Sequence, residues 1–241
     1  MSQYGRLGSK AMDANSLELR YRTYRLLRAV KEFVSLTEIS RETKIPVSML
    51  SRYANGTTLP SLATAKKLLD YLLSKEVTTS IVAKAIRVYN GFYNISGVIM
   101  DPRLLELIAE YVTKRFGGRF TRVLTPEAGG ISLATSIAIR AGVPMVVARK
   151  QRPPAEGQVL EIISMSGPAS YSVFYVPRRE LPRDSRVLIV DDFSIHGTTL
   201  RALVELVERA GARVAGAFVV VGVGDDWKVV SDAEALIEIK G

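Results

Sequence analysis

The stretch Val187–Leu200, VLIVDDFSIHGTTL, holds the pattern that decides the fold of most of the chain. Four apolar residues run into two adjacent acids, and a short polar loop then reaches a glycine and two threonines. A continuous apolar run is typical of a strand buried on both faces of a parallel sheet. We therefore expect Asp191 and Asp192 to emerge at the carboxyl end of a strand, and a helix to begin near Thr198, after Gly197.

The loop Ser194–Thr199 is predicted to bind an anion. It offers hydroxyls and free backbone N–H groups at the positive end of a helix, and Gly197 permits close backbone approach. A ligand that places a phosphate in this loop and its vicinal hydroxyls against the two acids matches a ribose 5-phosphate. The acids would also tolerate a nearby divalent cation. The sequence contains no GxxxxGK[ST] stretch, and no GxGxxG follows a strand.

Segments on both sides of this stretch alternate between expected strands and helices. The expected strands are RVLTP, VPMVVARK, YSVFYV, RVLIVDDF and VAGAFVVVGV, and the expected helices span 101–116, 130–141 and 198–210. The predicted fold class is α/β, a doubly wound, mostly parallel sheet preceded by a small all-α domain. Ligands of such sheets bind beyond the carboxyl ends of the strands.

Length and composition indicate an ordered protein with one large or two modest domains. The chain has 241 residues, 47% of them hydrophobic, and no cysteine, which excludes disulfides and thiolate metal sites. The start, MSQYGRLGSK, lacks the apolar core of a signal peptide. The longest uncharged apolar run, Val214–Gly224, is about half the ~20 residues that span a bilayer. We expect a cytoplasmic protein that does not enter the membrane.

Positive charge is concentrated in the N-terminal third. Residues 1–80 hold 13 Lys and Arg against 7 Asp and Glu, whereas residues 81–241 hold 20 against 17. This distribution fits a small nucleic-acid module attached to a near-neutral body, and it fits a well-solvated basic surface equally well.

The same third is predicted to be helical. Apolar residues recur at helical spacing over 17–33, and LTEISRETKIPVSMLSRYANGTTLPS (36–61) reads as two short helices joined by a turn. Thr37 is the expected cap of the first helix; the second starts near Val47 and ends at Asn55-Gly56. The positions expected to be buried are Ile39, Ile45, Val47 and Leu50. A further helix is expected over 62–73, a linker from KEVTTS (75–80), and short strands or loops over 81–100.

With its ending SRYANGTTLPS, the segment of about residues 20–74 resembles the phage-repressor type of helix-turn-helix domain. The resemblance implies that the helix 47–54 enters the major groove of double-stranded operator DNA. The residues expected to reach base edges or phosphate are Ser48, Ser51 and Arg52, and those expected to contact backbone phosphate are Lys44, Thr57 and Thr58. A helical hairpin used for dimerisation or docking is the alternative.

The opening stretch resembles the ribose-phosphate signature of type I phosphoribosyltransferases. TPEAGGISLAT (125–135) is similar to that family's first pyrophosphate loop and VVARK (146–150) to its second, so the match spans about residues 100–225. The resemblance implies that Asp191 and Asp192 hold the ribose hydroxyls. The implied 5-phosphate residues are Ser194, Ile195, His196, Gly197, Thr198 and Thr199. The implied diphosphate residues are Glu127, Ala128, Gly129, Gly130, Arg149 and Lys150.

The family also suggests a place for the base and a role for magnesium. An aromatic residue after the last strand often stacks on a purine, which makes Trp227 a candidate, with Asp225 or Asp226 nearby to accept from ring nitrogens; plain packing of Trp227 is the alternative. Mg²⁺ is expected only as a companion of phosphoribosyl pyrophosphate, without a dedicated metal site or a tightly bound cofactor.

One position departs from many enzymes of the family. Where they carry Asp, Thr or Ser in the loop, this chain has Ile195, which neither accepts a proton nor forms a hydrogen bond. His196, the only histidine, is at the next position and is expected to be a surface or capping residue. The segment 151–166 is short and acid-poor, which also argues against an elaborate catalytic lid. We predict no catalytic residue, although the xanthine phosphoribosyltransferases also lack an acid at that position.

The expected organisation is a DNA-binding domain over 1–78, a linker over 79–100 and an effector-binding domain over 101–241. This layout is similar to purine operon repressors and, because the N-terminus does not resemble their winged helix, more similar to archaeal phosphoribosyltransferase-like regulators. The prediction is a homodimeric transcriptional regulator that senses phosphoribosyl pyrophosphate or a nucleotide. An active purine or orotate phosphoribosyltransferase is the main alternative, and RNA attenuation is a third that the helix-turn-helix disfavours.

Overall fold

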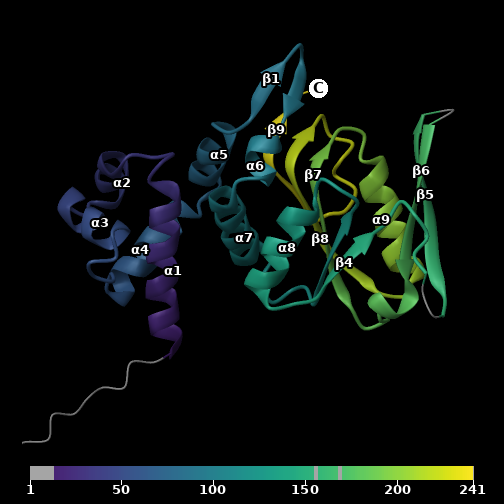
Figure 1. Cartoon of the computed structure of the whole chain (residues 1–241), viewed down its shortest axis with the longest axis horizontal. Coiled ribbons are helices and arrows are strands. Elements are labelled where there is room, and N and C mark those ends of the chain that lie inside the picture. Colours follow the sequence, from purple (N-terminus) through teal and green to yellow (C-terminus); the bar gives the residue numbers. More distant parts are fainter. Residues whose placement is uncertain (1–13, 155–156, 168–169, 241) are drawn as a thin grey trace, which may run out of the picture. The chain divides into compact units, whose positions relative to one another are not determined.

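The chain forms two compact units in a computed structural model that describes residues 14–154, 157–167 and 170–240. The units divide between Leu72 and Leu73, six residues before the expected boundary at 78. Figure 1 traces both units along the sequence.

The first unit is a small helical domain. Its described helices are α1 (Ala14–Val30), α2 (Leu36–Thr43), α3 (Val47–Ala54) and α4 (Leu62–Leu72). Helix α1 packs against α3 and α4, and α2 packs against the same two helices. The fully buried side chains at the centre are Leu26, Leu27, Ile39, Leu50, Leu68 and Leu72.

Two details of this unit differ from expectation. Ser35, not Thr37, caps α2: its hydroxyl accepts a hydrogen bond from the backbone N–H of Glu38 at 3.1 Å, which leaves Thr37 in the first turn. Val47 is 41% exposed and Ile45 is only partly buried. The beginning of α3 extends past the small core, because Leu50, Tyr53 and Ala54 already cover the inward side of the helix.

The second unit is built on a parallel five-stranded sheet, as predicted. The strands lie in the order β4–β3–β7–β8–β9, and every neighbouring pair is parallel. Their bounds are β3 Arg122–Pro126, β4 Met145–Ala148, β7 Arg186–Ser194, β8 Arg213–Val223 and β9 Ala233–Ile239. The sheet interior is continuously apolar, with Val187 to Val190 and Ala217 to Val221 buried.

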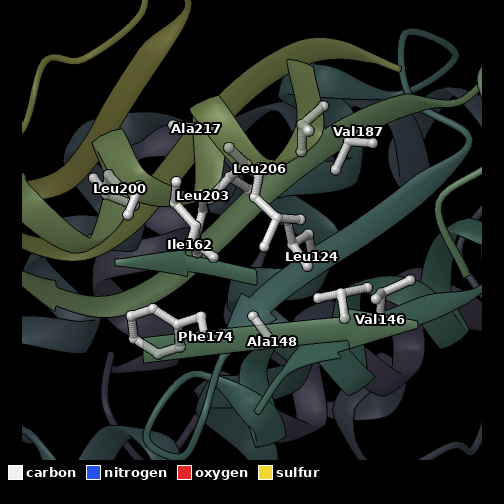
Figure 2. Close-up of a cluster of buried hydrophobic side chains, with 14 of the residues drawn as sticks. Leu124, Val146, Ala148, Ile162, Phe174, Val187, Leu200, Leu203, Leu206 and Ala217 are labelled. Carbon is white, nitrogen blue, oxygen red and sulfur yellow. The ribbon is translucent and has the colours of Figure 1, made fainter. Parts of the chain in front are cut away.

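Helices cover both faces of the sheet. Helices α7 (Pro102–Phe116) and α8 (Ile131–Ala141) lie on one face, and α9 (Thr198–Arg209) lies on the other (Figure 1). The antiparallel pair β5 (Val159–Gly167) and β6 (Ser170–Pro177) packs on the outer side of α9. Figure 2 shows the core on this side, where Leu200, Leu203 and Leu206 of α9 meet apolar side chains of the sheet and hairpin.

The segment expected to be a linker is folded into the second unit. KEVTTS lies in α5 (Lys75–Ala83), whose N-cap Ser74 accepts from the N–H of Val77, and Ile81 and Val82 are fully buried. The hydroxyl of Thr79 donates to the carbonyl of Leu236 in β9 at 2.8 Å. Tertiary packing here overrides the weak helix propensity of β-branched residues. The hairpin β1 (Arg87–Tyr89) and β2 (Phe92–Asn94) and the short helix α6 (Ser96–Ile99) follow.

The strand assignment needs three corrections. YSVFYV is β6, which pairs antiparallel with the unpredicted strand β5 instead of joining the parallel sheet. The strand β8 is not the last, because β9 pairs with it at the sheet edge. The strand β7 continues one residue past the expected RVLIVDDF, to Ser194, and Asp191 and Asp192 lie within its last residues. Pairing of Phe193 and Ser194 with Val221 and Gly222 of β8 extends the strand.

The order of the strands places a switch point between β3 and β7. From β3 the chain adds β4 on one side, and it then returns to add β7, β8 and β9 on the other side. Loops leaving the carboxyl ends of β3 and β7 therefore diverge and leave a crevice, the usual ligand position in this class of sheet. Among the described residues, no helix is both long and apolar enough to cross a membrane.

Replacing Leu203 by alanine should destabilise the second unit by about 3 kcal/mol, because it removes a fully buried side chain between α9 and the sheet. Ile139→Ala is the matched control, since Ile139 on α8 is 78% exposed, and it should change stability by less than about 0.5 kcal/mol. Urea unfolding of the full chain measures both values. Equal losses in the two variants would contradict this description of the core.

Candidate functional site

The switch point brings together the segments that the sequence singled out in the second unit. Thr125 and Pro126 end β3, Ala148 ends the adjacent β4, and Asp191 and Asp192 lie in the last part of β7 on the other side of β3. Three stretches far apart in the sequence thus meet at one edge of the sheet.

The two acids are strongly coupled. Asp191 is buried, and its Oδ1 accepts a hydrogen bond from the backbone N–H of Asp192 at 2.9 Å. Burial, followed by the charge of Asp192, raises the pKa of Asp191 well above the usual range of an aspartate, and the positive charge of Lys150 opposes the rise. A hydroxyl or cation that reached this carboxyl would relieve the cost of its burial.

Two glycines let the loop after β3 approach the acids. A Cβ on Gly129 would collide with the carboxylate of Asp192, and a Cβ on Gly130 would collide with the hydroxyl of Thr125 and approach Val190. The pair Gly129-Gly130 is therefore a consequence of close packing between the first loop and the strand that carries the acids. The peptide bond between Glu127 and Ala128 in this loop is cis.

The ends of β3 and β4 are tied to each other. The backbone N–H of Glu127 donates to the carbonyl of Ala148 at 3.0 Å, and the carboxylate of Glu127 accepts from the N–H of Lys150 at 2.8 Å. Arg149 forms an isolated antiparallel bridge with Tyr175 of β6. Of the predicted diphosphate residues, 127–130 and 149–150 are thus brought together beside Asp192.

The loop after β7 is fixed by a residue that the sequence did not single out. Gly197 adopts the left-handed conformation at φ 61°, and a Cβ there would collide with the carbonyl of Asp226. The guanidinium of Arg201 donates to the carbonyls of His196 and Asp226, the latter at 3.0 Å. Arg201 therefore links the predicted 5-phosphate loop to the segment after β8 through these hydrogen bonds. In the sequence, only its position one turn into α9 could have indicated this role.

Within the predicted 5-phosphate loop, exposure varies from residue to residue. Ser194 is buried, Ile195 is 44% exposed, and the side chain of His196 is exposed. Thr198 and Thr199 form the first turn of α9 and are partly exposed, so their hydroxyls and backbone N–H groups lie at the positive end of the helix. The arrangement has the features of a helix-terminus anion site.

Trp227 is a packing residue in this structure. It is only 2% exposed, its indole N–H donates to the carbonyl of Gly224 at 2.8 Å, and a Cβ on Gly222 would lie 2.6 Å from its Nε1. The ring is part of the hydrophobic cluster that includes Leu200 and Leu203, and Lys228 Nζ lies 5.3 Å from its centroid. This environment agrees with the packing alternative, and base stacking stays a prediction; the neighbouring Asp225 pairs with Lys228 at 2.6 Å.

The hairpin β1–β2 contributes aromatic side chains that the sequence left without a role. Tyr93 contacts Phe193, the residue after the two acids, with a ring-centroid distance of 6.3 Å. Phe92 is 78% exposed, and Tyr89 and Val88 are more than half exposed. The hairpin therefore presents apolar surface next to the carboxyl end of β7.

The second unit also has a recess away from the switch point. A space of about 620 Å³ lies beside the edge strand β9, but its charged lining is largely paired internally. Arg115 pairs with Glu234 at 2.7 Å and Lys75 pairs with Glu238 at 3.1 Å. The residues that the sequence singled out as ligand-binding, apart from Trp227, lie at the switch point and not in this recess.

In the first unit, the predicted DNA-contacting residues lie on and around α3. Ser48 and Arg52 are exposed on the helix, and Ser51 is partly exposed, with its hydroxyl near the amide of Asn55 at 3.5 Å. Lys44 is exposed in a left-handed turn between α2 and α3, and Thr57 and Thr58 follow α3. Val47 was expected in the core but is exposed beside Ser48, where a methyl-bearing side chain can contact thymine.

Comparisons with known proteins agree with both halves of this description. The phosphoribosyl transferase domain model matches residues 100–238, and a helix-turn-helix model matches residues 34–74. An adenine phosphoribosyltransferase structure from Thermoanaerobacter pseudethanolicus has a TM-score of 0.60 and 24% identity, and covers 67% of this chain and 99% of its own. That likeness concerns the fold.

Curated relatives are purine phosphoribosyltransferases by name. The chain is 38% identical over 125 residues to a xanthine phosphoribosyltransferase of Heliobacterium modesticaldum, and 35% identical over 126 residues to a hypoxanthine/guanine phosphoribosyltransferase of Methanohalophilus mahii. These matches cover 51% and 52% of this chain and only 66% and 64% of the relatives. A xanthine phosphoribosyltransferase of Geobacillus thermodenitrificans is 36% identical, over 61% of this chain and 79% of its own.

The fold and the crevice define an α/β protein of the type I phosphoribosyltransferase class, preceded by a helix-turn-helix unit. The chain belongs to the phosphoribosyl transferase domain family.

Asp191→Asn should raise the free energy of unfolding at neutral pH by about 1 kcal/mol, because it removes a buried charge next to Asp192. The folded state holds the proton of Asp191 more tightly than the unfolded chain does. The contribution of Asp191 to the free energy of unfolding is therefore present at low pH and is lost as pH rises through the raised pKa. The D191N variant should lack this pH-dependent contribution. Thermal unfolding across pH measures it, with the exposed Asp184→Asn as control. Identical pH profiles of D191N and the wild type would refute the argument.

Proposed function

We propose that this protein is a DNA-binding transcriptional regulator whose phosphoribosyltransferase-like unit senses phosphoribosyl pyrophosphate or a nucleotide. The observation that carries the proposal is the presence, in one chain, of a helix-turn-helix unit and a phosphoribosyl transferase domain whose loop after β7 has Ile195 where many enzymes of the family carry Asp, Thr or Ser.

The ligand assignment follows the chemistry of the crevice. Asp191 and Asp192 would accept hydrogen bonds from the vicinal hydroxyls of a ribose, and Ser194 to Thr199 would bind its 5-phosphate at the start of α9. Backbone N–H groups of 127–130, with Arg149 and Lys150, would meet the diphosphate. The short path from Asp192 to Gly129 supports binding of both ends of one molecule.

Magnesium would enter with the ligand. Mg²⁺ is usually bound through one or two carboxylates together with substrate phosphates, and Asp191 with Asp192 fits that requirement. Among the described residues, no group of three or more acidic or histidine side chains forms a dedicated metal site. When bound, the ion would neutralise the diphosphate, while the protein groups orient the ribose.

The character of the loop favours sensing over catalysis. Ile195 is 44% exposed in the loop and has no atom that can accept or donate a proton. His196 follows it, and its backbone carbonyl is engaged by Arg201. General acid–base catalysis needs a titratable group within hydrogen-bond reach of the reacting atom. The described loop from Ser194 to Thr199 supplies such a group only in His196.

An active purine phosphoribosyltransferase with an accessory helix-turn-helix unit is the second candidate. The names of the relatives favour it, since those that match at 38% and 35% identity are xanthine and hypoxanthine/guanine enzymes. A transferase can also obtain much of its rate from binding and electrostatic stabilisation without a general base.

Ligand titration separates sensing from turnover. Phosphoribosyl pyrophosphate with Mg²⁺ should change operator affinity by about 5- to 150-fold, the usual range of allosteric coupling. A panel of purine and pyrimidine bases should release no pyrophosphate above background. Robust pyrophosphate release would establish the enzyme reading, and an unchanged affinity with every nucleotide and phosphoribosyl pyrophosphate would refute sensing. Asp192→Asn should abolish the response while leaving DNA binding without ligand intact.

The DNA half of the proposal has its own test. A single helix-turn-helix unit covers one half-site, so we expect a homodimer on a two-fold symmetric operator. Arg52→Ala should weaken operator binding by about tenfold to a hundredfold, because an arginine contact to base edges or phosphate is lost from α3. Arg41→Ala is the control, since Arg41 lies on α2 and pairs with Glu42 at 2.9 Å. Unchanged binding by R52A in a mobility-shift or footprinting experiment would contradict the assignment of α3 as the recognition helix.

A further inference from the structure

A group of arginines lies at the amino edge of the parallel sheet, opposite the candidate ligand site. Three strands begin with this residue: β3 with Arg122, β7 with Arg186 and β8 with Arg213. Because all strands are parallel, their first residues share one edge. We call Arg122, Arg186 and Arg213, together with Arg183, the arginine edge.

The pairing register places two of these charges, Arg186 and Arg213, side by side, whereas the side chain of Arg122 leaves the opposite face of the sheet at the same edge. Arg186 and Arg213 are register partners on adjacent strands, and Arg122 pairs with Val187, the residue after Arg186. Neighbouring strands are about 4.8 Å apart, and like charges directly opposite each other destabilise a sheet. Arg183 lies beside the turn before β8, with its Cγ 3.4 Å from where a Cβ on Gly211 would be.

The arginine edge has no acidic partner of its own. Within the described part of the chain, no carboxylate forms a salt bridge with Arg122, Arg183, Arg186 or Arg213. Nearby acids are engaged elsewhere: Asp232 pairs with Arg119 at 3.4 Å and Glu234 pairs with Arg115 at 2.7 Å. Asp184 is exposed next to Arg183 and offsets part of the charge.

Two of these guanidinium groups are positioned by neutral oxygens. Arg186 Nε donates to the carbonyl of Arg119 at 2.8 Å, and its Nη2 donates to the carbonyl of Gly118 at 3.4 Å. Arg122 Nε donates to the hydroxyl of Ser185 at 3.1 Å. These bonds hold the charges in place without neutralising them and leave N–H groups free for an external anion. Such pre-positioned guanidinium groups suit phosphate.

We propose that the arginine edge is a second nucleic-acid contact surface, which binds the phosphate backbone of duplex DNA. The occupant must carry repeated negative charge, because four arginines without a salt bridge in the described part of the chain, three of them at the starts of adjacent strands, match a row of phosphates better than a single anion. The identification of that polyanion as DNA rests on the proposed function. Along β7, Arg186 and Asp191 are five residues apart, or about 17 Å, so this edge and the ribose crevice can be occupied at once.

The test uses the full chain with Arg183→Glu and Arg213→Glu combined. Both side chains are exposed and neither makes a hydrogen bond in the described structure, so folding should be unaffected. The control combines Arg87→Glu and Lys240→Glu, which make the same charge change on the hairpin β1–β2 and beyond the carboxyl end of β9. Binding to a long duplex of generic sequence is measured over a series of salt concentrations.

The R183E/R213E variant should bind about tenfold more weakly, and the slope of log affinity against log salt should become shallower by about two, one for each lost phosphate contact. The control should keep the wild-type slope. Equal slopes in the two double variants would overturn the proposal. Binding to polyglutamate is measured in parallel. If R183E/R213E weakens binding to polyglutamate but not to DNA, the proposal is also overturned, because the partner is then an acidic protein. Arg52→Ala tested alongside separates the two surfaces: if only R52A weakens binding, the arginine edge is refuted and the regulator proposal stands. If only R183E/R213E weakens binding, the arginine edge stands and the assignment of α3 as the recognition helix is refuted.

Discussion

The buried carboxyl of Asp191, held beside Asp192 at the end of β7, is the constraint on which the rest of the crevice depends. The fold keeps two acids together in a place where burial, followed by the charge of Asp192, raises the pKa of Asp191. Neighbouring residues accommodate the two acids. The positive charge of Lys150 lowers the pKa of Asp191, and Gly129 leaves room for the carboxylate of Asp192. Burial of Asp191 does not favour the charged form, and a neutral side chain would satisfy the fold better, which agrees with the proposed binding role.

The same constraint suggests how binding could reach the rest of the chain. A ligand that bridges the acids and the loop after β7 would also act on Arg201, which joins the carbonyls of His196 and Asp226. The segment after β8 carries Trp227, buried in the cluster shared with α9. Coupling requires a ligand that favours one arrangement of such elements over another. The contacts of Arg201 identify the loop and the β8–β9 connection as the elements that a phosphate would bias together.

The sequence predicted the parallel sheet well, because the sheet depends on local patterns. The apolar run 187–190, the acids after it and the glycine before α9 each have a conformational meaning that holds in any context. Edges and pairings were predicted less well. The strand β9 has an alternating, partly charged pattern, and α5 is rich in β-branched residues, so both depend on contacts with distant elements. Arg201 was missed for the same reason: its partner carbonyl in Asp226 lies on a segment that only the fold brings near.

Charge shows most clearly what a linear reading leaves out. The sequence places most of the excess positive charge in residues 1–80, and the remainder looks nearly neutral. In the fold, that remainder separates: acids lie in the crevice at the carboxyl edge, whereas arginines begin three neighbouring strands at the amino edge. A small net charge is therefore compatible with a strongly basic surface, because parallel strands gather their first residues on one side. The arrangement gives the second unit two edges of opposite character, one with a pair of acids and the other with a group of arginines.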